Sequence, residues 1–228
     1  MQYHYDAAFC IYKSMGFYWV KTRWFIKKIF PRFVWDMPNN ERTIYLTFDD
    51  GPTPEVTDWV LDILREHDIR ATFFCIGNNI EKHPDIFMKV VNAGHAIGNH
   101  TFNHILGWNT DNKTYQENAD ACDKSILSRY PAFESAKLFR PPYGRMKAAQ
   151  AKAMIKKGYR IIMWDVLAAD FDREISTEQC LDNVIRHAEE GSIIIFHDSV
   201  KAYENLRYAL PKAIAYLKEK NFRFGKIS

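Results

Sequence analysis

Short apolar runs and longer amphipathic segments alternate along the chain from residue 43 to its end. Seven runs rich in β-branched and aromatic residues predict strands at 43–48, 71–76, 95–99, 137–140, 159–164, 192–197 and 222–226. Between them, apolar residues recur at helical spacing and predict helices at 54–67, 79–93, 113–130, 146–157, 177–189 and 203–219. Regular alternation of strands and helices of these lengths indicates βα units and a mostly parallel sheet.

This alternation predicts an α/β fold, a distorted (β/α) barrel with about seven parallel strands. Seven strands separated by six helices suit a barrel better than a two-sided open sheet, although periodicity leaves the closure of the barrel open. In such folds the residues that follow the strands gather at one mouth. We therefore expect the polar residues after the strands to form one site. No linker or low-complexity segment interrupts residues 42–228, which we interpret as one domain.

Residues 1–41 differ in character, and we interpret them as a basic, aromatic, helical extension. In the stretch 15–30, MGFYWVKTRWFIKKIF, aromatic and apolar residues are interspersed with Lys21, Arg23, Lys27 and Lys28. One interpretation is a helix in peripheral contact with an anionic membrane surface. The other is a helix packed across the barrel with its lysines in water, and this one is favoured because Arg23 interrupts the apolar face.

Composition and charge exclude some classes of protein. A formal net charge of +3 over 228 residues gives no indication of nucleic-acid binding. No run of about 18 apolar residues predicts a transmembrane helix, and the start MQYHYDAAFC lacks the features of a signal peptide. We expect a cytoplasmic protein, with membrane association as an open alternative, and the oligomeric state stays open. The cysteines are far apart and are expected to be free buried thiols: Cys10, Cys75, Cys122 and Cys180.

Two adjacent carboxylates, Asp49 and Asp50, follow the apolar run TIYLTF and precede Gly-Pro. They repel each other and are costly to desolvate. In HTFNH, His100 and His104 are four residues apart, so both rings can reach one ion. With one carboxylate from another strand end they would form a metal site with open positions. The second aspartate could then take a proton from water at the ion. The alternative is that the aspartates cap the next helix and shape the turn.

Four motifs in order resemble those of the polysaccharide deacetylases with a NodB homology domain, also called carbohydrate esterase family four. They are TFDDGPT (47–53), HTFNH (100–104), RPPYG (140–144) and IIIFHDS (193–199), which resemble the first, second, third and fifth motifs. The resemblance covers about residues 42–226 and implies that 42–228 is a catalytic domain.

The resemblance also implies a role for residues of each motif. Asp50, His100 and His104 are implied as ligands of one divalent metal ion, with zinc favoured and cobalt or another divalent ion as the alternative. Asp49 is implied as the general base, and Arg140 would hold it by a charge-assisted contact.

The remaining implied roles concern the oxyanion, the leaving group and the substrate. The backbone N–H of Tyr143 would stabilise the oxyanion. His197 would protonate the leaving amine, and Asp170 would orient His197. The residues expected to bind substrate are Pro141, Tyr143, Phe171 and Ile195.

The fourth motif, WDVLAADF (164–171), departs from the family pattern. Leu167 stands where an aspartate is usual, and Phe171 replaces a tryptophan that helps line the pocket for the acetyl methyl group. Phenylalanine keeps that pocket apolar but makes it roomier and removes an N–H donor. The preferred acyl group and sugar therefore stay open.

The resemblance implies metal-dependent hydrolysis of the acetamide of an N-acetylated sugar in an oligo- or polysaccharide, such as peptidoglycan or a chitooligosaccharide, with release of acetate. One alternative is an O-acetyl esterase acting on a glycan such as acetylated xylan, which would use the same metal and base. A second is a non-catalytic glycan-binding relative, although every residue assigned to metal, base and acid is present. An Fe(II) oxygenase shares the ligand types but is typically all-β, which the pattern does not predict.

Overall fold

The computed structural model describes residues 18–228, whose strands form one curled, nine-stranded sheet in which every paired strand runs parallel. The order of the strands is β1-β6-β5-β4-β3-β2-β8-β7, and β9 also pairs with β2. The strands are β1 (Phe33–Val34), β2 (Thr43–Asp49), β3 (Thr72–Cys75), β4 (Ala96–Asn99), β5 (Leu138–Phe139), β6 (Arg160–Ile162), β7 (Val166–Leu167), β8 (Ile193–His197) and β9 (Arg223–Gly225).

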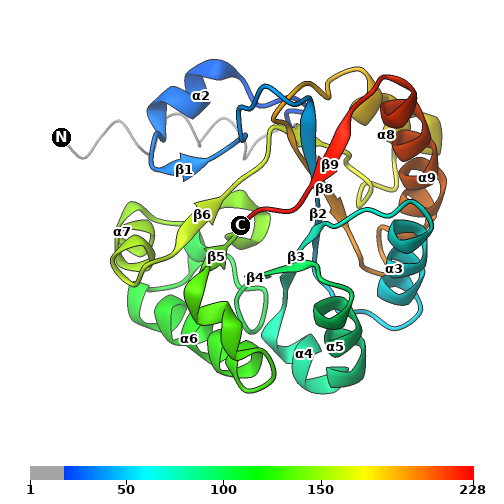
Figure 1. The fold of residues 1–228 in the computed structure, drawn as a ribbon. Coiled ribbons are helices and arrows are strands. Elements are labelled where there is room, and N and C mark those ends of the chain that lie inside the picture. Colours follow the sequence, from blue (N-terminus) through cyan, green and yellow to red (C-terminus); the bar gives the residue numbers. More distant parts are fainter. Residues whose placement is uncertain (1–17) are drawn as a thin grey trace.

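Helices cover the outside of this sheet, as Figure 1 shows. They are α2 (Trp24–Ile29), α3 (Val56–Glu66), α4 (Gly77–Lys82), α5 (Pro84–Asn92), α6 (Asn112–Leu127), α7 (Ala148–Lys156), α8 (Thr177–Ile185) and α9 (Tyr203–Glu219), with the short 3₁₀ turns η2 (Gly107–Asn109), η3 (Pro131–Ser135) and η4 (Pro142–Gly144). A parallel sheet with crossover helices on its outer face is the distorted (β/α) barrel expected from the sequence, and that prediction is confirmed.

The seven predicted strands are all present, and two further strands, β1 and β7, have only two residues each. The helix predicted at 79–93 is two helices, because Pro84 lacks an N–H and begins α5 as its first residue. Within 15–30 the observed helix covers only Trp24–Ile29, and residues 15–17 and Cys10 lie outside the described part. The other cysteines are buried free thiols, as expected: Cys75, Cys122 and Cys180.

Aromatic and aliphatic side chains fill the interior of the curled sheet. Phe48 of β2 stacks on Phe73 at 5.0 Å and on Phe196 at 6.1 Å between ring centroids, and all three are buried. The interior is therefore a packed core that closes the barrel beneath its mouth. None of the helices within residues 18–228 has the length and apolarity that spanning a bilayer requires.

The segment before β2 lies between β6 and β7 and contacts both strands. On one side of it, β1 pairs with β6. On the other side, the Leu167 N–H donates to the Val20 carbonyl and the Thr22 N–H donates to the Asp165 carbonyl, both at 2.8 Å. The N-terminal segment therefore hydrogen-bonds to both edges of the half-barrel and becomes part of its wall.

Charged side chains fasten this segment to the sheet. Asp165 is only 1% exposed. Its Oδ2 accepts hydrogen bonds from Lys21 Nζ and from the Ser192 hydroxyl, and its Oδ1 accepts one from Lys27 Nζ, each at 2.6 Å. A buried carboxylate is stable only with such partners. The expectation that the lysines lie in water is therefore wrong for Lys21 and Lys27, whereas Lys28 is exposed.

Candidate metal and active site

The carboxyl ends of the central strands bring the motif residues together. Asp49 ends β2 and is the Cα partner of His197, which ends β8. His100 directly follows β4, and Arg140 directly follows β5. Because the strands are parallel, these side chains share one mouth of the barrel. The convergence expected from the sequence is thus present in the structure.

Asp50, His100 and His104 form a site that can hold a divalent metal ion. Their potential ligand atoms all lie within 4.8 Å of one another. Asp50 Oδ1 is 3.3 Å from His104 Nε2 and 3.8 Å from His100 Nε2. Two ligands of one tetrahedral ion are about 3.4 Å apart when each bond is about 2.0–2.2 Å long. Asp50 Oδ1 is also buried without a hydrogen-bond partner, and a cation would satisfy that oxygen.

A hydrogen bond fixes the orientation of the His100 ring. Its Nδ1 lies 2.7 Å from the carbonyl oxygen of Arg140. A carbonyl only accepts, so Nδ1 carries the proton and the lone pair of Nε2 is free towards Asp50. Burial lowers the pKa of His100 well below its usual value, and it also lowers the pKa of His104. Both rings are therefore neutral at pH 7, which is the form that binds metal.

The loop that carries the histidines is held by Asn99. Its Oδ1 accepts the Thr101 N–H at 2.7 Å, and its Nδ2 donates to Asp123 Oδ1 at 2.7 Å. Asn99 has no role in the sequence motifs, although Asn commonly bonds the backbone two residues on. Five left-handed non-glycine residues lie in the loops around this mouth: Asp50, Thr101, His104, Tyr143 and Ala169. Such strained backbone tends to cluster at functional sites.

Arg140 holds the other carboxylate of the pair. Its Nη1 donates to Asp49 Oδ1 at 2.7 Å and to Thr47 Oγ1 at 2.8 Å, and its Nη2 donates to the Met163 carbonyl at 2.8 Å. The guanidinium also lies 4.1 Å from the centre of the Phe74 ring. Arg140 is fully buried and Asp49 is 2% exposed. The pair is therefore rigid, and one oxygen of Asp49 is engaged by Arg140.

Asp198 fixes the turn that follows the two aspartates. Its Oδ1 accepts the Gly51 N–H at 3.0 Å and its Oδ2 accepts the Thr57 hydroxyl at 2.6 Å. A Cβ at position 51 would lie 1.9 Å from Asp198 Oδ2, so only glycine fits there. Asp198 thus reaches across from the end of β8 to the loop that carries Asp50.

His197 is paired with Asp170. Its Nδ1 lies 2.8 Å from Asp170 Oδ1, and its backbone N–H donates to Oδ2 at 2.7 Å. Burial disfavours the imidazolium, but the charge of Asp170 and this hydrogen bond outweigh it and raise the pKa of His197 to about 9. At neutral pH His197 is therefore protonated and can act as an acid.

Apolar side chains form a wall beside His197. Ile195 and Leu167 are buried there, and the Phe171 ring meets the His197 ring edge-on at 5.1 Å. Tyr18 packs against Phe171 at 5.7 Å, and its hydroxyl donates to Asp172 Oδ2 at 2.7 Å. Sequence reasoning missed Tyr18, because no local pattern links it to a partner 154 positions away.

The third motif borders the metal site on its outer side. Tyr143 has a left-handed backbone, with φ of 60°, and its ring lies 4.6 Å from the His104 ring. The Tyr143 side chain is 59% exposed, whereas Pro141 is buried. Tyr143 therefore lies where a ligand at the mouth would meet it, whereas contact of the buried Pro141 with substrate stays a prediction.

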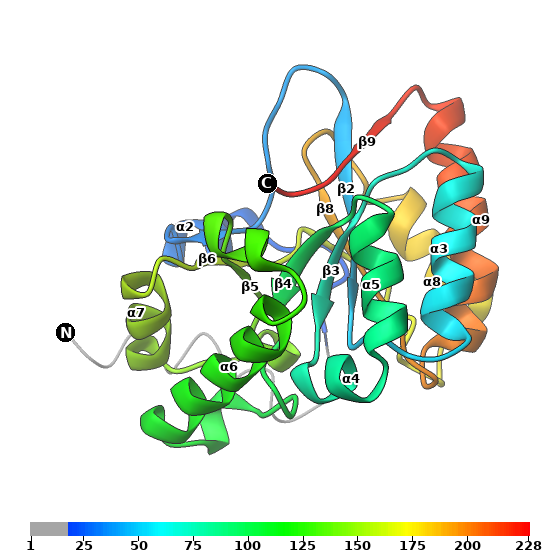
Figure 2. The same cartoon turned by 60° about the horizontal axis from the view of Figure 1, so that its bottom comes forward.

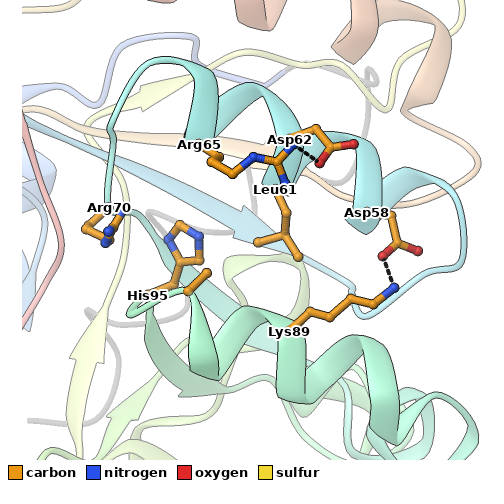
Figure 3. A pocket seen from close by; sticks show the side chains of 8 residues that line it. Asp58, Leu61, Asp62, Arg65, Arg70, Lys89 and His95 are labelled. Carbon is orange, nitrogen blue, oxygen red and sulfur yellow. Dashed lines mark hydrogen bonds and ion pairs between the residues drawn. The ribbon is translucent and has the colours of Figure 1, made fainter.

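A second concave region lies between α3 and α5, away from the strand ends that carry the motifs (Figure 3). It is a groove of about 580 Å³ in which Lys89 pairs with Asp58 at 2.7 Å. His95 borders it, and its Nδ1 accepts the Ala71 N–H at 3.1 Å. Burial lowers the pKa of His95 to about 4, so it is a neutral structural histidine.

Comparison with known proteins gives consistent matches. Residues 36–162 match the polysaccharide deacetylase family. A peptidoglycan-N-acetylglucosamine deacetylase of Bacillus cereus is 34% identical over 195 residues, which are 85% of this chain and 90% of that protein. A chitooligosaccharide deacetylase of Azorhizobium caulinodans is 38% identical over 162 residues, which are 70% of this chain and 75% of that protein. The crystal structure of the Bc1960 peptidoglycan N-acetylglucosamine deacetylase, in complex with a hydroxamate, superimposes with a TM-score of 0.82 at 30% identity, covering 90% of this chain and 95% of that one.

Proposed function

Because this chain belongs to the polysaccharide deacetylase family, we propose that it hydrolyses the acetamide of N-acetylglucosamine units in peptidoglycan or chitooligosaccharides and releases acetate. One observation carries this proposal. Asp50 Oδ1 is buried without a partner between two histidines, while the adjacent Asp49 is held by Arg140. Two neighbouring carboxylates in such different surroundings are suited to different tasks.

Asp50, His100 and His104 would hold the metal ion. When bound, a divalent ion supplies Lewis acidity, which polarises the acetamide carbonyl and makes water acidic enough for a carboxylate to deprotonate it. The mixed nitrogen and oxygen donors favour zinc, with cobalt as the alternative. Elemental analysis of the purified protein identifies the native ion.

Asp49 is the proposed general base. Its Oδ2 lies 3.7 Å from His100 Nε2, so it is next to the metal ligands, and its Oδ1 is fixed by Arg140. In this position Asp49 accepts a proton from the attacking water. The backbone N–H of Tyr143 is proposed to donate to the oxyanion, and the contact of its ring with His104 supports this.

His197 is the proposed general acid. Its pKa helps to decide whether the substrate is an N-acetyl amide or an O-acetyl ester. An amide nitrogen leaves only as a protonated amine, so N-deacetylation needs an acid that is charged at working pH. The pairing with Asp170 supports that state of His197. When the C–N bond breaks, His197 gives its proton to the sugar nitrogen, and the products are acetate and the free amine. Phe171, Ile195 and Leu167 supply the apolar wall for the acetyl methyl group.

An acetate-release assay tests the proposed function. The purified chain, loaded in turn with zinc and cobalt, is given peptidoglycan fragments, chitooligosaccharides and acetylated xylan. We expect release from the N-acetylated substrates and little from xylan. Asp49→Asn is the matched control, and it should lose turnover while binding one equivalent of metal. Full activity of Asp49→Asn would exclude Asp49 as the base, and faster release from xylan would favour the esterase.

The cytoplasmic location expected from the sequence stays a prediction. Contact with a membrane, the open alternative for residues 15–30, is taken up below from the surface of α2.

A further inference from the structure

Large hydrophobic side chains that remain exposed are concentrated on α2. Within residues 18–228, three of the five such side chains belong to this six-residue helix: Trp24 is 67% exposed, and Phe25 and Ile29 are each 40% exposed. Trp24 and Phe25 also meet edge-on at 6.2 Å. A contiguous exposed aromatic cluster of this kind commonly marks a binding surface.

The geometry of the helix separates an outward face from an inward one. At 3.6 residues per turn, Trp24, Lys28, Phe25 and Ile29 fall within an arc of about 140°. Ile26 lies outside that arc and is 6% exposed. The apolar residues of α2 therefore point in two directions, and the larger group faces solvent.

Contacts on the inward face prevent the helix from rolling over to hide its aromatic residues. Lys27 forms ion pairs with Asp36 and with Asp165, the latter at 2.6 Å. Although burial disfavours the charge of Lys27, the hydrogen bonds that its Nζ donates to these two carboxylates raise its pKa. The Trp35 indole N–H donates to the Phe30 carbonyl at 3.2 Å, just after the helix. The exposed face of α2 is therefore fixed in place.

The exposed charged residues in and around α2 are all basic. Arg23, Lys28 and Arg32 are exposed, and residues 18–35 contain no Asp or Glu. Lys28 Nζ lies 4.8 Å from the centre of the Trp24 ring, so the cation and the aromatic ring form one surface. Basic side chains around exposed aromatic residues suit the headgroup region of an anionic bilayer, where Trp is enriched.

We propose that the α2 surface, made of Arg23, Trp24, Phe25, Lys28, Ile29 and Arg32, docks the enzyme on an anionic lipid membrane. The aromatic and aliphatic side chains enter the headgroup boundary, and the three cations contact lipid phosphates. This interaction goes beyond the proposed deacetylation and does not depend on it.

The position of α2 leaves the active site open during such docking. The chain passes from Tyr18, beside Phe171, along β7 in the antiparallel direction, with a bridge between Lys21 and Val166. It thus moves away from the carboxyl end of β7 before α2 begins, and Figure 2 shows α2 on the flank of the barrel. A membrane at this flank leaves the mouth free for a glycan.

Vesicle sedimentation with the full chain tests the proposal. We expect sedimentation with vesicles of phosphatidylcholine mixed with phosphatidylglycerol, little with phosphatidylcholine alone, and release at high salt. The double variant Arg23→Gln with Lys28→Gln should raise the dissociation constant for anionic vesicles roughly 30-fold, because each cation near the surface contributes roughly fivefold in affinity. Trp24→Ser with Phe25→Ser should also reduce it. The matched control, Lys124→Gln with Lys152→Gln, removes two exposed cations on α6 and α7 and should bind like the unmodified chain.

Release of acetate from a soluble chitooligosaccharide checks that the variants are folded, and it should be unchanged in all of them. If the unmodified chain stays in solution with anionic vesicles at low salt, the proposal is wrong. The proposal is also wrong if the α2 double variant and the control double variant lower vesicle binding equally. A dimer that Trp24→Ser with Phe25→Ser converts to monomers would instead assign the surface to a second copy of this chain. If the unmodified chain binds anionic vesicles but releases no acetate, only the proposed deacetylation is contradicted.

Discussion

Arg140, whose side chain is completely buried, donates a hydrogen bond of 2.7 Å to Oδ1 of Asp49, whereas Oδ1 of the adjacent Asp50 is buried without a partner. The two carboxylates are neighbours in sequence but have opposite surroundings. An oxygen engaged by a guanidinium is poorly available to a metal ion, and an oxygen without a donor is well suited to one. This difference is the structural basis for assigning the metal to Asp50 and the base to Asp49.

Replacing Arg140 with methionine should destabilise the protein by about 3–5 kcal/mol, because the buried carboxylate of Asp49 would lose the guanidinium that pairs with it. Urea unfolding measures this cost. The double variant Arg140→Met with Asp49→Asn should cost clearly less than the sum of the two single variants, since no unpaired charge remains. Additive costs would show that the pair is not coupled.

Replacing Asp50 with asparagine should abolish stabilisation by zinc. In the unmodified chain, zinc at 100 times its dissociation constant should add about 2.7 kcal/mol of stability. With a chelator present, Asp50→Asn should be at least as stable as the unmodified chain, because the carboxylate oxygen it alters has no donor to lose. Thermal unfolding with and without zinc measures both effects. A large loss of stability in chelator would give Asp50 a structural role instead.

Replacing Asp170 with asparagine should move the alkaline limit of activity to lower pH. Asp170 raises the pKa of His197 to about 9, so His197 keeps its proton below that value and loses it above. Without the negative partner the pKa falls, and the protonated acid disappears at a lower pH. The pH profile of kcat for acetate release measures this shift. An unchanged alkaline limb, with activity merely scaled down, would mean that another group supplies the proton.

Tyr18 is expected to position Phe171 in the acyl pocket. Tyr18→Ala removes the ring whose centroid lies 5.7 Å from that of Phe171. Phe171 should then be able to move aside, so that the pocket accepts a larger acyl group. We expect the ratio of kcat/KM for N-propionyl over N-acetyl chitooligosaccharide to rise about 10-fold, the lower end of the effect of one methylene. Tyr18→Phe keeps the ring and is the matched control. Equal ratios in both variants and the unmodified chain would place Tyr18 outside the pocket.

Much of the fold could be predicted because strand and helix periodicity are local properties. The runs that predict β2, β3, β4 and β8 are long enough to show their character, and their parallel order places the following residues at one mouth. The pairs Asp49–Asp50 and His100–His104 could be interpreted as a metal site for the same reason. The boundary at residue 41 between extension and catalytic domain stays a prediction.

The amino-acid sequence by itself determined the strand–helix alternation and indicated the candidate metal-site residues, since both depend on spacing within a few residues. The family resemblance implied that Arg140 holds Asp49, but only the tertiary structure decided which oxygen Arg140 engages, that Asp198 holds the turn at Gly51, and that Lys21 reaches Asp165. These contacts join residues 91, 147 and 144 positions apart. The free energy of burying a charge or an N–H group depends on which partner folding brings next to it, and no local pattern encodes that partner.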